Sequence, residues 1–331
     1  MKASRIVILL LSLALCLSLF TACKDKEQEG EQTDEVYYTV TFNTNGGGEI
    51  EPKLVKKGSS VDEPPTPERD GYIFDGWYDG SREWVFSFSV NNDMTLTARW
   101  ISADSMFEHN PAEDGETTVI TKLKQRTEEI RLPTYMGGYK VAAIADGVFS
   151  HLSSEDVYTI VVPECITVIG NEAFMSCTDI EIIIEGELSY VGEKAFYGCN
   201  GLKSVKLGGG METVTAEAFV GAGLTSIALP STVKVVDENA FSECEAMKTL
   251  FVCDTIEAIN DSAFHGTGII AVYFYGTDEG VAKVLDEKIF ARNDVILDAK
   301  QYIYSETEPA GETELDGFWY FNENGQTRIW N

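Results

Sequence analysis

The sequence predicts a mainly β protein, in which a small β-rich module is followed by a solenoid of repeated coils and a short helix and hairpin cap. Two patterns predict this fold class. In the first part of the chain, hydrophobic residues alternate with Thr in short runs separated by Gly and Pro, and a phenylalanine then recurs every 22 to 25 residues. With 331 residues, 44% of them hydrophobic, the chain is long enough for more than one packed core.

The first 22 residues have the composition of an export signal. Two cations, Lys2 and Arg5, precede an apolar run that ends at Phe20. Charged residues follow soon afterwards, so the run is short for a transmembrane helix, and residues 1–22 are predicted to be a signal peptide. The residues FTAC resemble a bacterial lipobox, which implies that Cys23 is acylated and anchors the chain in a membrane. A signal peptide that is cleaved beside an incidental cysteine is the alternative.

The charge of the chain limits its partners. Loss of residues 1–22 removes two cations and no acid, so the net charge falls from -29 to -31. Such a surface repels phosphate backbones and anionic lipids, so we expect no binding to nucleic acid, while basic patches on a partner would be attracted. Residues 23–36 consist of Cys23 and a polar, acidic run without periodicity, and they are expected to form a tether.

Residues 37–101 have the pattern of short strands joined by Gly and Pro turns. The runs VTFNTNGG, PTPERDGYIFDGWY and TLTARW occur there in this order. They closely resemble the internalin B-type repeat, also called the Listeria-Bacteroides repeat, which implies a β-grasp-like module of a bacterial surface protein. Tyr72, Phe74 and Trp77 are expected to lie in its core, with contact to a ligand as the alternative.

The strongest pattern in the sequence is a phenylalanine that follows Val or Ala once in each coil. Aliphatic residues lie five and eight positions before it, and a small residue, often Cys, follows it in most coils. Because a coil of about 23 residues cannot close a core alone, we expect the coils to stack and bury one column of phenylalanine rings. The recurring residues are Phe149, Phe174, Phe196, Phe219, Phe241 and Phe264.

This pattern closely resembles the BspA-like leucine-rich repeats, related to the Treponema pallidum type, over residues 102–276. The shared features are Ala-Phe, the Cys after it and an L-x-x-V-x-L stretch, all repeated from coil to coil. The resemblance implies a leucine-rich-repeat solenoid, and members of this family are mostly surface proteins linked to adhesion. The Cys is expected to fill a tight buried turn, with a disulfide or a metal ligand as the alternative.

Residues 277–331 lose the period and are expected to cap the open end of the solenoid. Residues 279–292 predict a helix with one apolar face. The run FWYF, the pair Asn324-Gly325 and a second short apolar run predict a hairpin. A separate sugar-binding module is the alternative for the aromatic residues of this tail.

No constellation of residues in the sequence supports catalysis. His109, His151 and His265 lack the spacing of metal ligands, and motifs for phosphate binding, dinucleotide binding and nucleophilic attack are missing. The acidic residues are scattered, as on a solvated surface, and no C-x-x-C pair or calcium loop occurs. We therefore expect neither an enzyme nor a bound metal or cofactor.

The outward positions of the L-x-x-V-x-L strands are the expected binding face. Alignment on the phenylalanines places Ile184, Lys206, Phe251 and Tyr273 in one outward ladder, with Tyr275 beside its aromatic end. Exposed aromatic residues on a rigid sheet are good recognition anchors. Coverage of Phe251 and Tyr273 by the C-terminal cap is the alternative.

The favoured function is that of a lipid-anchored extracellular binding protein on the bacterial cell surface. It would act as an adhesin that recognises a protein or glycan, of host or bacterial origin, through the solenoid sheet. The first alternative is a structural or assembly component of the bacterial envelope that binds another surface protein. An enzyme with an unrecognised site is the least favoured reading, and the repeats do not identify a ligand because they constrain only the core.

Overall fold

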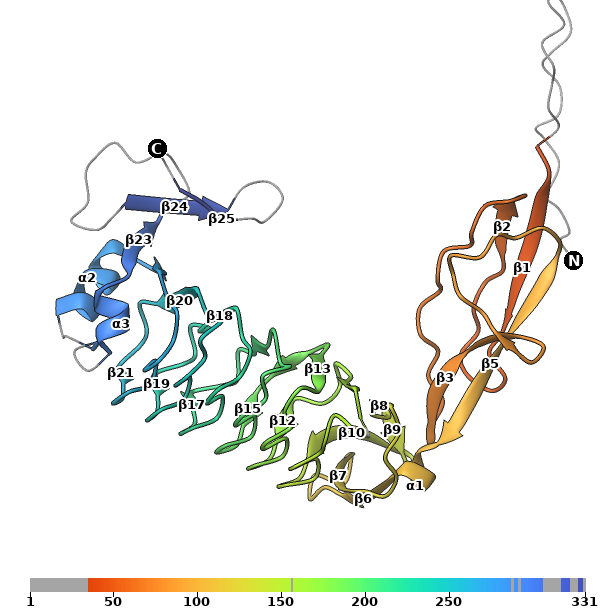
Figure 1. The fold of residues 1–331 in the computed structure, drawn as a ribbon, viewed down its shortest axis with the longest axis horizontal. Helices are drawn as coiled ribbons and strands as arrows, with labels where there is room; N and C mark the ends of the chain where they lie inside the picture. Colours follow the sequence, from red (N-terminus) through yellow and green to blue (C-terminus); the bar gives the residue numbers. More distant parts are fainter. Residues whose placement is uncertain are drawn as a thin grey trace, which may run out of the picture.

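The computed structural model describes residues 35–155, 157–286, 289–290, 293–305, 317–321 and 327–329. It shows a small sheet module, a curved solenoid and a C-terminal group of helices and strands, in this order along the chain (Figure 1). The predicted signal peptide and Cys23 lie outside the described residues. Within these ranges, no helix is long and apolar enough to cross a membrane.

The N-terminal module is a five-stranded mixed sheet. Its first and last strands are parallel neighbours, and its other neighbouring strands are antiparallel. In the order of the sheet, the strands are β2 (Lys53–Lys56), β1 (Tyr37–Asn43), β5 (Met94–Ser102), β3 (Tyr72–Asp79) and β4 (Arg82–Glu83). This is a compact β module of the kind that the turn residues predicted.

Alternation of apolar and polar residues gives this sheet one packed face. In β1, Val40 and Phe42 are buried and the residues between and beside them are exposed. Trp77 lies in the core, as predicted, and its ring meets that of Phe42 edge to face at 5.2 Å. Phe74 is only half-buried, and its ring packs against both Trp77 and Trp100. The module therefore has its own core, which ends in partly exposed aromatic residues.

The module is fixed to the solenoid by shared packing and by two hydrogen bonds. Ile73 of β3 belongs to the hydrophobic core of the solenoid rather than to that of the module. The Gly71 N–H donates to the Tyr135 carbonyl at 3.1 Å, and the Gly138 N–H donates to the Asp70 carboxylate at 3.2 Å. The junction is therefore a packed interface between the two parts.

A short helix and two strands close the N-terminal end of the solenoid. Helix α1 (Ala103–Met106) leads into β6 (Phe107–Pro111), which pairs antiparallel with β7 (Thr117–Leu123). Phe107 is buried, and its ring meets that of Phe149 edge to face at 6.4 Å. This segment thus covers the first ring of the repeat column.

Short parallel strands form ladders along two sides of the solenoid. The first ladder consists of two sheets. One continues from β7 through β10 (Tyr139–Ile144), with β9 (Tyr135–Met136) at its side, to β12 (Val168–Ile169) and β15 (Tyr190–Val191), and the other contains β17 (Thr213–Val214), β19 (Val235–Val236) and β21 (Ala258–Ile259). The second ladder consists of three sheets. The first contains β8 (Glu129–Arg131), β11 (Thr159–Val162) and β13 (Glu181–Ile184), the second β14 (Glu187–Leu188) and β16 (Lys206–Leu207), and the third begins with β18 (Ser226–Ala228), β20 (Thr249–Cys253) and β22 (Ala271–Tyr275).

The six repeated phenylalanines form the predicted column between these ladders. All six rings are fully buried. Neighbouring ring centroids lie 5.0 to 5.5 Å apart, and the ring planes differ by only 4 to 13°. The predicted stacking of the coils around one continuous core is therefore confirmed.

Each ring is held between two residues with left-handed backbone conformation, at φ between +54° and +74°. Two positions before the rings lie Gly147, Glu172, Lys194, Glu217, Asn239 and Ser262. Two positions after them lie His151, Ser176, Gly198, Gly221, Glu243 and Gly266. The left-handed conformation costs an L residue about 1 kcal/mol or more, so packing of the coils must offset this strain at every non-glycine position.

The C-terminal segment extends the second ladder and ends in the predicted hairpin. Beyond β22 the sheet continues in parallel through β23 (Lys300–Tyr304) and β24 (Gly317–Phe321), and β24 pairs antiparallel with β25 (Thr327–Ile329). The helix predicted over residues 279–292 is observed as α2 (Asp278–Asp286), followed by the short α3 (Asp294–Leu297). Val281 and Val284 of α2 are buried against the end of the solenoid, which is the role expected of a cap.

Candidate functional site

The structure brings the aromatic residues of the predicted face together. The rings of Phe251 and Tyr273 are stacked at 5.1 Å, and Tyr302 of the added strand β23 extends the stack at 5.3 Å. Trp319 of β24 packs edge to face across both Phe251 and Tyr273, at 5.6 and 5.4 Å. Phe251 and Tyr273 are half-buried in consequence, whereas Trp319 is only 2% exposed. The aromatic end is thus partly covered by the cap, which was the alternative considered for it.

The other two predicted residues of this face have different surroundings. The Tyr275 hydroxyl donates to the Leu229 carbonyl, so its polar end is used within the protein. Burial raises the pKa of the Tyr275 hydroxyl above its ordinary value, which keeps it protonated near neutral pH. Lys206 is exposed and pairs in the sheet with Glu187, away from the aromatic stack. The structure therefore brings Phe251 and Tyr273 together and leaves Lys206 apart.

The predicted register of the outward ladder is wrong at Ile184. Ile184 is half-buried and packs against the solenoid core, while Ile183 points outward and is 40% exposed. The reason is coil length. The coil that begins at Phe174 has 22 residues, one fewer than the coils that begin at Phe196 and Phe241, and the missing residue lies between the ring and the strand. A one-residue shift exchanges the buried and exposed faces of a strand.

A strip of exposed residues remains on the second ladder between the module and the aromatic stack. The strip consists of Ser204, Lys206, Ser226 and Ala228, all of them exposed. In Figure 1 the module and β24 both rise from the side of the solenoid that carries β13, β18 and β20. The strip therefore lies on the side of the solenoid that faces the space between the two ends of the molecule.

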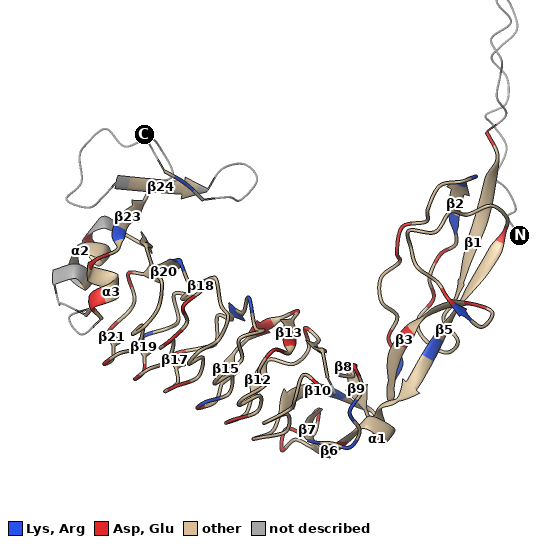
Figure 2. Cartoon of the chain, in the orientation of Figure 1, with Lys and Arg blue, Asp and Glu red and all other residues tan. Residues whose placement is uncertain are grey.

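The opposite edge of the solenoid is acidic. Figure 2 shows Asp and Glu at the turns beside β17, β19 and β21. Glu217 and Glu238 lie in the turns that follow β17 and β19, and Glu193 lies in the equivalent turn after β15. Lys194 lies 3.7 Å from carboxylate oxygens of both Glu193 and Glu217. These pairs are solvated, so each contributes at most about 1 kcal/mol to stability.

The repeated cysteines have a structural role. Cys177, Cys199 and Cys244 are fully buried, and the five cysteines among the described residues are all free thiols. Each of the three buried thiols donates a hydrogen bond of 3.0 Å to a phenylalanine carbonyl of the preceding coil. The pairs are Cys177 with Phe149, Cys199 with Phe174 and Cys244 with Phe219. The small side chain thus fits the turn and satisfies a buried carbonyl.

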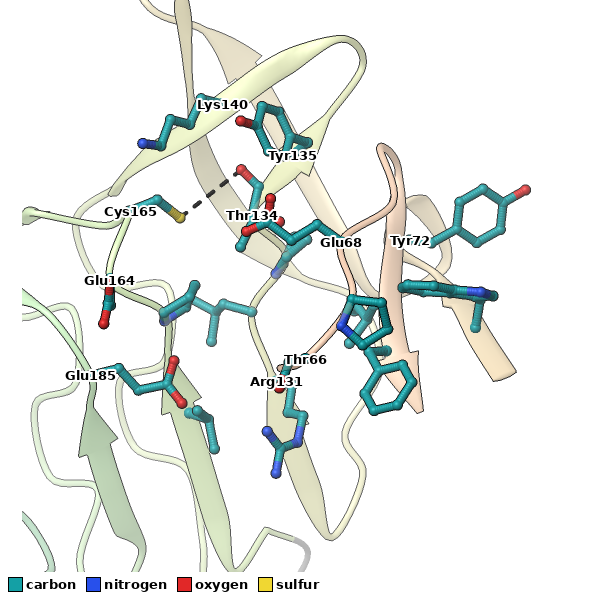
Figure 3. A pocket seen from close by; sticks show the side chains of 18 of the residues that line it. Thr66, Glu68, Tyr72, Arg131, Thr134, Tyr135, Lys140, Glu164, Cys165 and Glu185 are labelled. Carbon is teal, nitrogen blue, oxygen red and sulfur yellow. Dashed lines mark hydrogen bonds between the residues drawn. The ribbon is translucent and has the colours of Figure 1, made fainter. Parts of the chain in front are cut away.

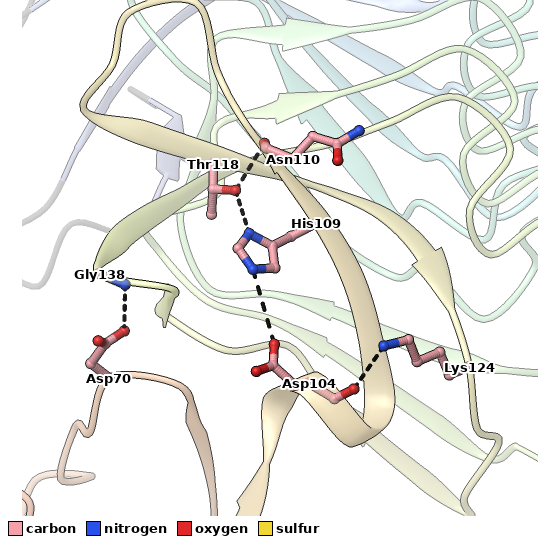
Figure 4. A network of polar contacts seen from close by, with 7 residues as sticks. All are labelled: Asp70, Asp104, His109, Asn110, Thr118, Lys124 and Gly138. Atoms are coloured by element: carbon pink, nitrogen blue, oxygen red, sulfur yellow. Dashed lines mark hydrogen bonds and ion pairs between the residues drawn. The ribbon is translucent and has the colours of Figure 1, made fainter.

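A polar network near the junction contains residue types that also occur in catalytic triads. His109 Nδ1 lies 2.8 Å from the Thr118 hydroxyl, which donates to the Asn110 carbonyl at 2.9 Å (Figure 4). The Thr118 hydroxyl has only one proton and donates it to Asn110, so it must accept the hydrogen bond from the His109 Nδ1–H. His109 Nε2 lies 4.0 Å from Asp104. Thr118 is fully buried and its proton is already donated, so the network is structural rather than nucleophilic.

A groove with a volume of about 580 Å³ lies between the module and the first coils of the solenoid. Tyr72, Phe74 and Trp100 line it from the module, and Arg131, Val161 and Glu185 are among the residues that line it from the solenoid. Figure 3 shows Glu164, Cys165 and Glu185 on one side, with Thr66 and Glu68 of the module across from them. The volume is in the range of ligand-binding pockets.

The thiol that lines this groove is not activated. The Cys165 thiol is half-buried, and desolvation raises its pKa to about 11, so it is protonated and a poor nucleophile at neutral pH. Within the part of the chain that the structure describes, no group of three His, Cys, Asp or Glu side chains could hold a metal ion. The sequence did not point to this groove because it forms where the module meets the first coils of the solenoid, and neither sequence pattern gives the position of one part relative to the other.

Family models match both repeated parts of the chain. Residues 167–294 match the BspA type Leucine rich repeat region in six copies, and residues 38–99 match the Listeria-Bacteroides repeat domain. Both resemblances derived from the sequence motifs are therefore confirmed. The boundaries 37–101 and 102–276 stay predictions.

Relatives resemble a short part of the chain. A candidate Gly-rich membrane protein of Evansella cellulosilytica is 42% identical over 67 residues, which cover 19% of this chain and 8% of that protein. Internalin H of Listeria monocytogenes is 35% identical over 86 residues, which cover 24% of this chain and 14% of internalin H. The chain therefore matches only a small part of the length of these relatives.

Solved structures of bacterial leucine-rich-repeat proteins are similar to part of the chain. The Treponema pallidum leucine-rich-repeat protein is 19% identical, with a TM-score of 0.34, over 51% of this chain and 69% of that one. A leucine-rich-repeat protein of Bacteroides ovatus is 17% identical, with a TM-score of 0.39, over 61% of this chain and 64% of that one.

Proposed function

We propose that this protein is an adhesin of the bacterial cell surface, a binding protein without enzymatic activity. It would be anchored to the membrane through an acylated Cys23, and residues 23–36 would hold the folded part away from the membrane. Its ligand would be a protein or glycan, of host or bacterial origin, that contacts the second ladder of the solenoid.

One observation carries this proposal. The core is filled by a stack of rings that keeps the coils in register. The strip of Ser204, Lys206, Ser226 and Ala228 is exposed and contributes nothing to that core. Residues that are free of packing constraints on a rigid, curved scaffold are the ones available for recognition. The aromatic end at Phe251 and Tyr273 would contribute only through the ring surface that Trp319 leaves uncovered.

The comparisons support an extracellular location. The chain contains two repeat types found in bacterial surface proteins, and its relatives include a membrane protein and an internalin. Labelling of producing cells with a radioactive fatty acid tests the anchor. Incorporation should be lost in Cys23→Ala, and label that persists in this variant would exclude anchoring through Cys23.

A pair of matched substitutions tests the binding face. Ser226 and Ser231 are both exposed, but Ser226 lies in the strip and Ser231 lies in the turn that follows the strand. A bulky cation at the first position should block a ligand on the sheet. We expect Ser226→Arg to weaken binding to ligands found on glycan and matrix-protein arrays by about tenfold or more, and Ser231→Arg to leave it unchanged. Equal binding by both variants would exclude this face.

Capture experiments with the purified protein distinguish an adhesin from a structural component of the envelope. If it captures proteins from the producer's own envelope but binds no host matrix protein or glycan, the structural alternative replaces the adhesin. Binding to a host matrix component that is lost in Ser226→Arg supports the adhesin.

A further inference from the structure

Strand β8 has a free edge at the groove. It lies at the end of the sheet β13-β11-β8, so only β11 pairs with it. The Leu132 N–H donates to the Val161 carbonyl at 3.0 Å, and Glu128 accepts from Thr159. In a parallel ladder successive residues direct their main-chain groups to opposite sides, so the N–H and carbonyl of Arg131 point away from β11. Within the described ranges, these two groups have no hydrogen-bond partner.

The free edge faces an open space with apolar walls. A hollow of about 130 Å³ adjoins the main groove, and both are lined by Ile73, Phe74 and Arg131. The space therefore extends to both sides of Arg131 along the strand. Val161, which points outward beside Arg131 but is only 6% exposed, and the half-buried Trp100 provide apolar surface across this space.

The rim of the groove is acidic. Glu68, Glu164 and Glu185 are exposed, and none of them has an ion-pair partner among the described residues. The Arg131 guanidinium is paired with the Glu129 carboxylate of the same strand, which leaves Lys140 as the unpaired cation lining the groove within the described ranges. The rim therefore favours a partner with positive charge.

We propose that this groove binds an extended polypeptide segment that carries Lys or Arg side chains, and that the segment adds a strand to β8. The main-chain groups of Arg131 would hold its backbone, the apolar walls would receive alternate side chains, and the glutamates would bind the basic ones. This site is separate from the strip around Ser226 and does not depend on the function proposed for that strip.

Two substitutions of Arg131 that differ in the outward N–H test the added strand. Arg131→Pro removes that N–H, yet it leaves the hydrogen bonds between β8 and β11 intact because those involve Glu128, Ile130 and Leu132. Arg131→Ala is the matched control, since it removes the same side chain and ion pair but keeps the N–H. The probe is a displayed library of random ten-residue peptides selected against the purified protein.

Selection should yield peptides enriched in Lys and Arg. Their affinity should fall by about tenfold in Arg131→Pro and by less than about threefold in Arg131→Ala. It should also fall by about fivefold in Glu185→Lys and stay unchanged in Glu238→Lys, which alters net charge equally at an exposed position outside the groove. Thermal unfolding of each variant, followed by circular dichroism, controls for folding.

Three results would overturn this proposal. The first is that no selected peptide depends on Glu185 for binding. The second is that Arg131→Pro and Arg131→Ala bind the peptides with equal affinity. The third is that no peptide binds, while a glycan binds and this binding is lost in Trp100→Ala. The last result would assign the groove to a carbohydrate. If Ser226→Arg abolishes array binding while the peptides still bind, the two sites are independent.

Discussion

Removal of one ring from the middle of the stack should cost several kcal/mol of stability. Phe219 is fully buried between Phe196 and Phe241, whose ring centroids lie at 5.5 and 5.2 Å. In Phe219→Ala, the loss of roughly 120 Å² of buried apolar surface at about 25 cal/mol per Å² amounts to about 3 kcal/mol. Each neighbouring ring also loses a stacking contact worth about 0.5 kcal/mol or more. The expected total is about 4 kcal/mol, which is typical of a buried Phe→Ala substitution.

Urea denaturation of the purified protein, followed by circular dichroism, measures this loss. Phe219→Leu is the control because it keeps most of the volume and should cost only about 1.5 kcal/mol. Since each coil contacts only its neighbours, the alanine variant should also unfold less cooperatively, and hydrogen exchange should accelerate first in the coils of Phe196, Phe219 and Phe241. A loss below about 1 kcal/mol in Phe219→Ala would refute the continuous core as the source of stability.

Three further perturbations test other parts of the architecture. A Cβ at Gly201 would lie 1.8 Å from the Ile180 carbonyl oxygen, so Gly201→Ala should lower the free energy of unfolding by about 3 kcal/mol in the same denaturation assay. A Cβ at Gly209 would have no atom within 4 Å, so Gly209→Ala should change this free energy by less than about 0.5 kcal/mol. Thr118→Val should cost about 2 kcal/mol by the same measurement, because the Asn110 carbonyl and His109 Nδ1–H both lose a partner, and an unchanged stability would contradict the hydrogen bonds of Figure 4. Because burial raises the pKa of Cys165 to about 11, its alkylation by iodoacetamide at pH 8 should be roughly 100-fold slower than that of an ordinary thiol and should accelerate up to pH 11. The neutral thiol is favoured in the folded state, so the stability that it contributes is complete below pH 9 and is lost as the pH rises towards 11. An alkylation rate that reaches its plateau by pH 10 would contradict the raised pKa.

The repeat core could be predicted from the sequence because its period is set by a single requirement. Every coil must place one large ring at the same point, so Phe149 to Phe264 recur with almost constant spacing and the stack follows. The side of the strand that faces outward was harder to predict. It depends on how many residues separate the ring from the strand. After Phe174 this segment is one residue shorter than the alignment assumed, so Ile183 and not Ile184 faces outward.

Contacts between distant segments could not be predicted in this way. Trp319 covers Phe251 and Tyr273 because β24 joins the sheet beyond β23, and no period in the sequence gives the position of a strand outside the repeats. The groove has the same origin. Trp100 and Arg131 belong to different folded parts, and they face one space only because the junction fixes the angle between those parts.

The packing of this junction bears directly on how well the groove can bind. A cavity between two freely moving modules would have to be ordered at every binding event, and that ordering would reduce affinity. Here Ile73 is buried in the solenoid core, and the bonds from Gly71 to Tyr135 and from Gly138 to Asp70 hold both walls in place before any ligand arrives. An extended peptide would then lose mainly its own conformational entropy on binding. Loosening the junction with Asp70→Ala should therefore weaken peptide binding by increasing dissociation, although Asp70 does not line the groove.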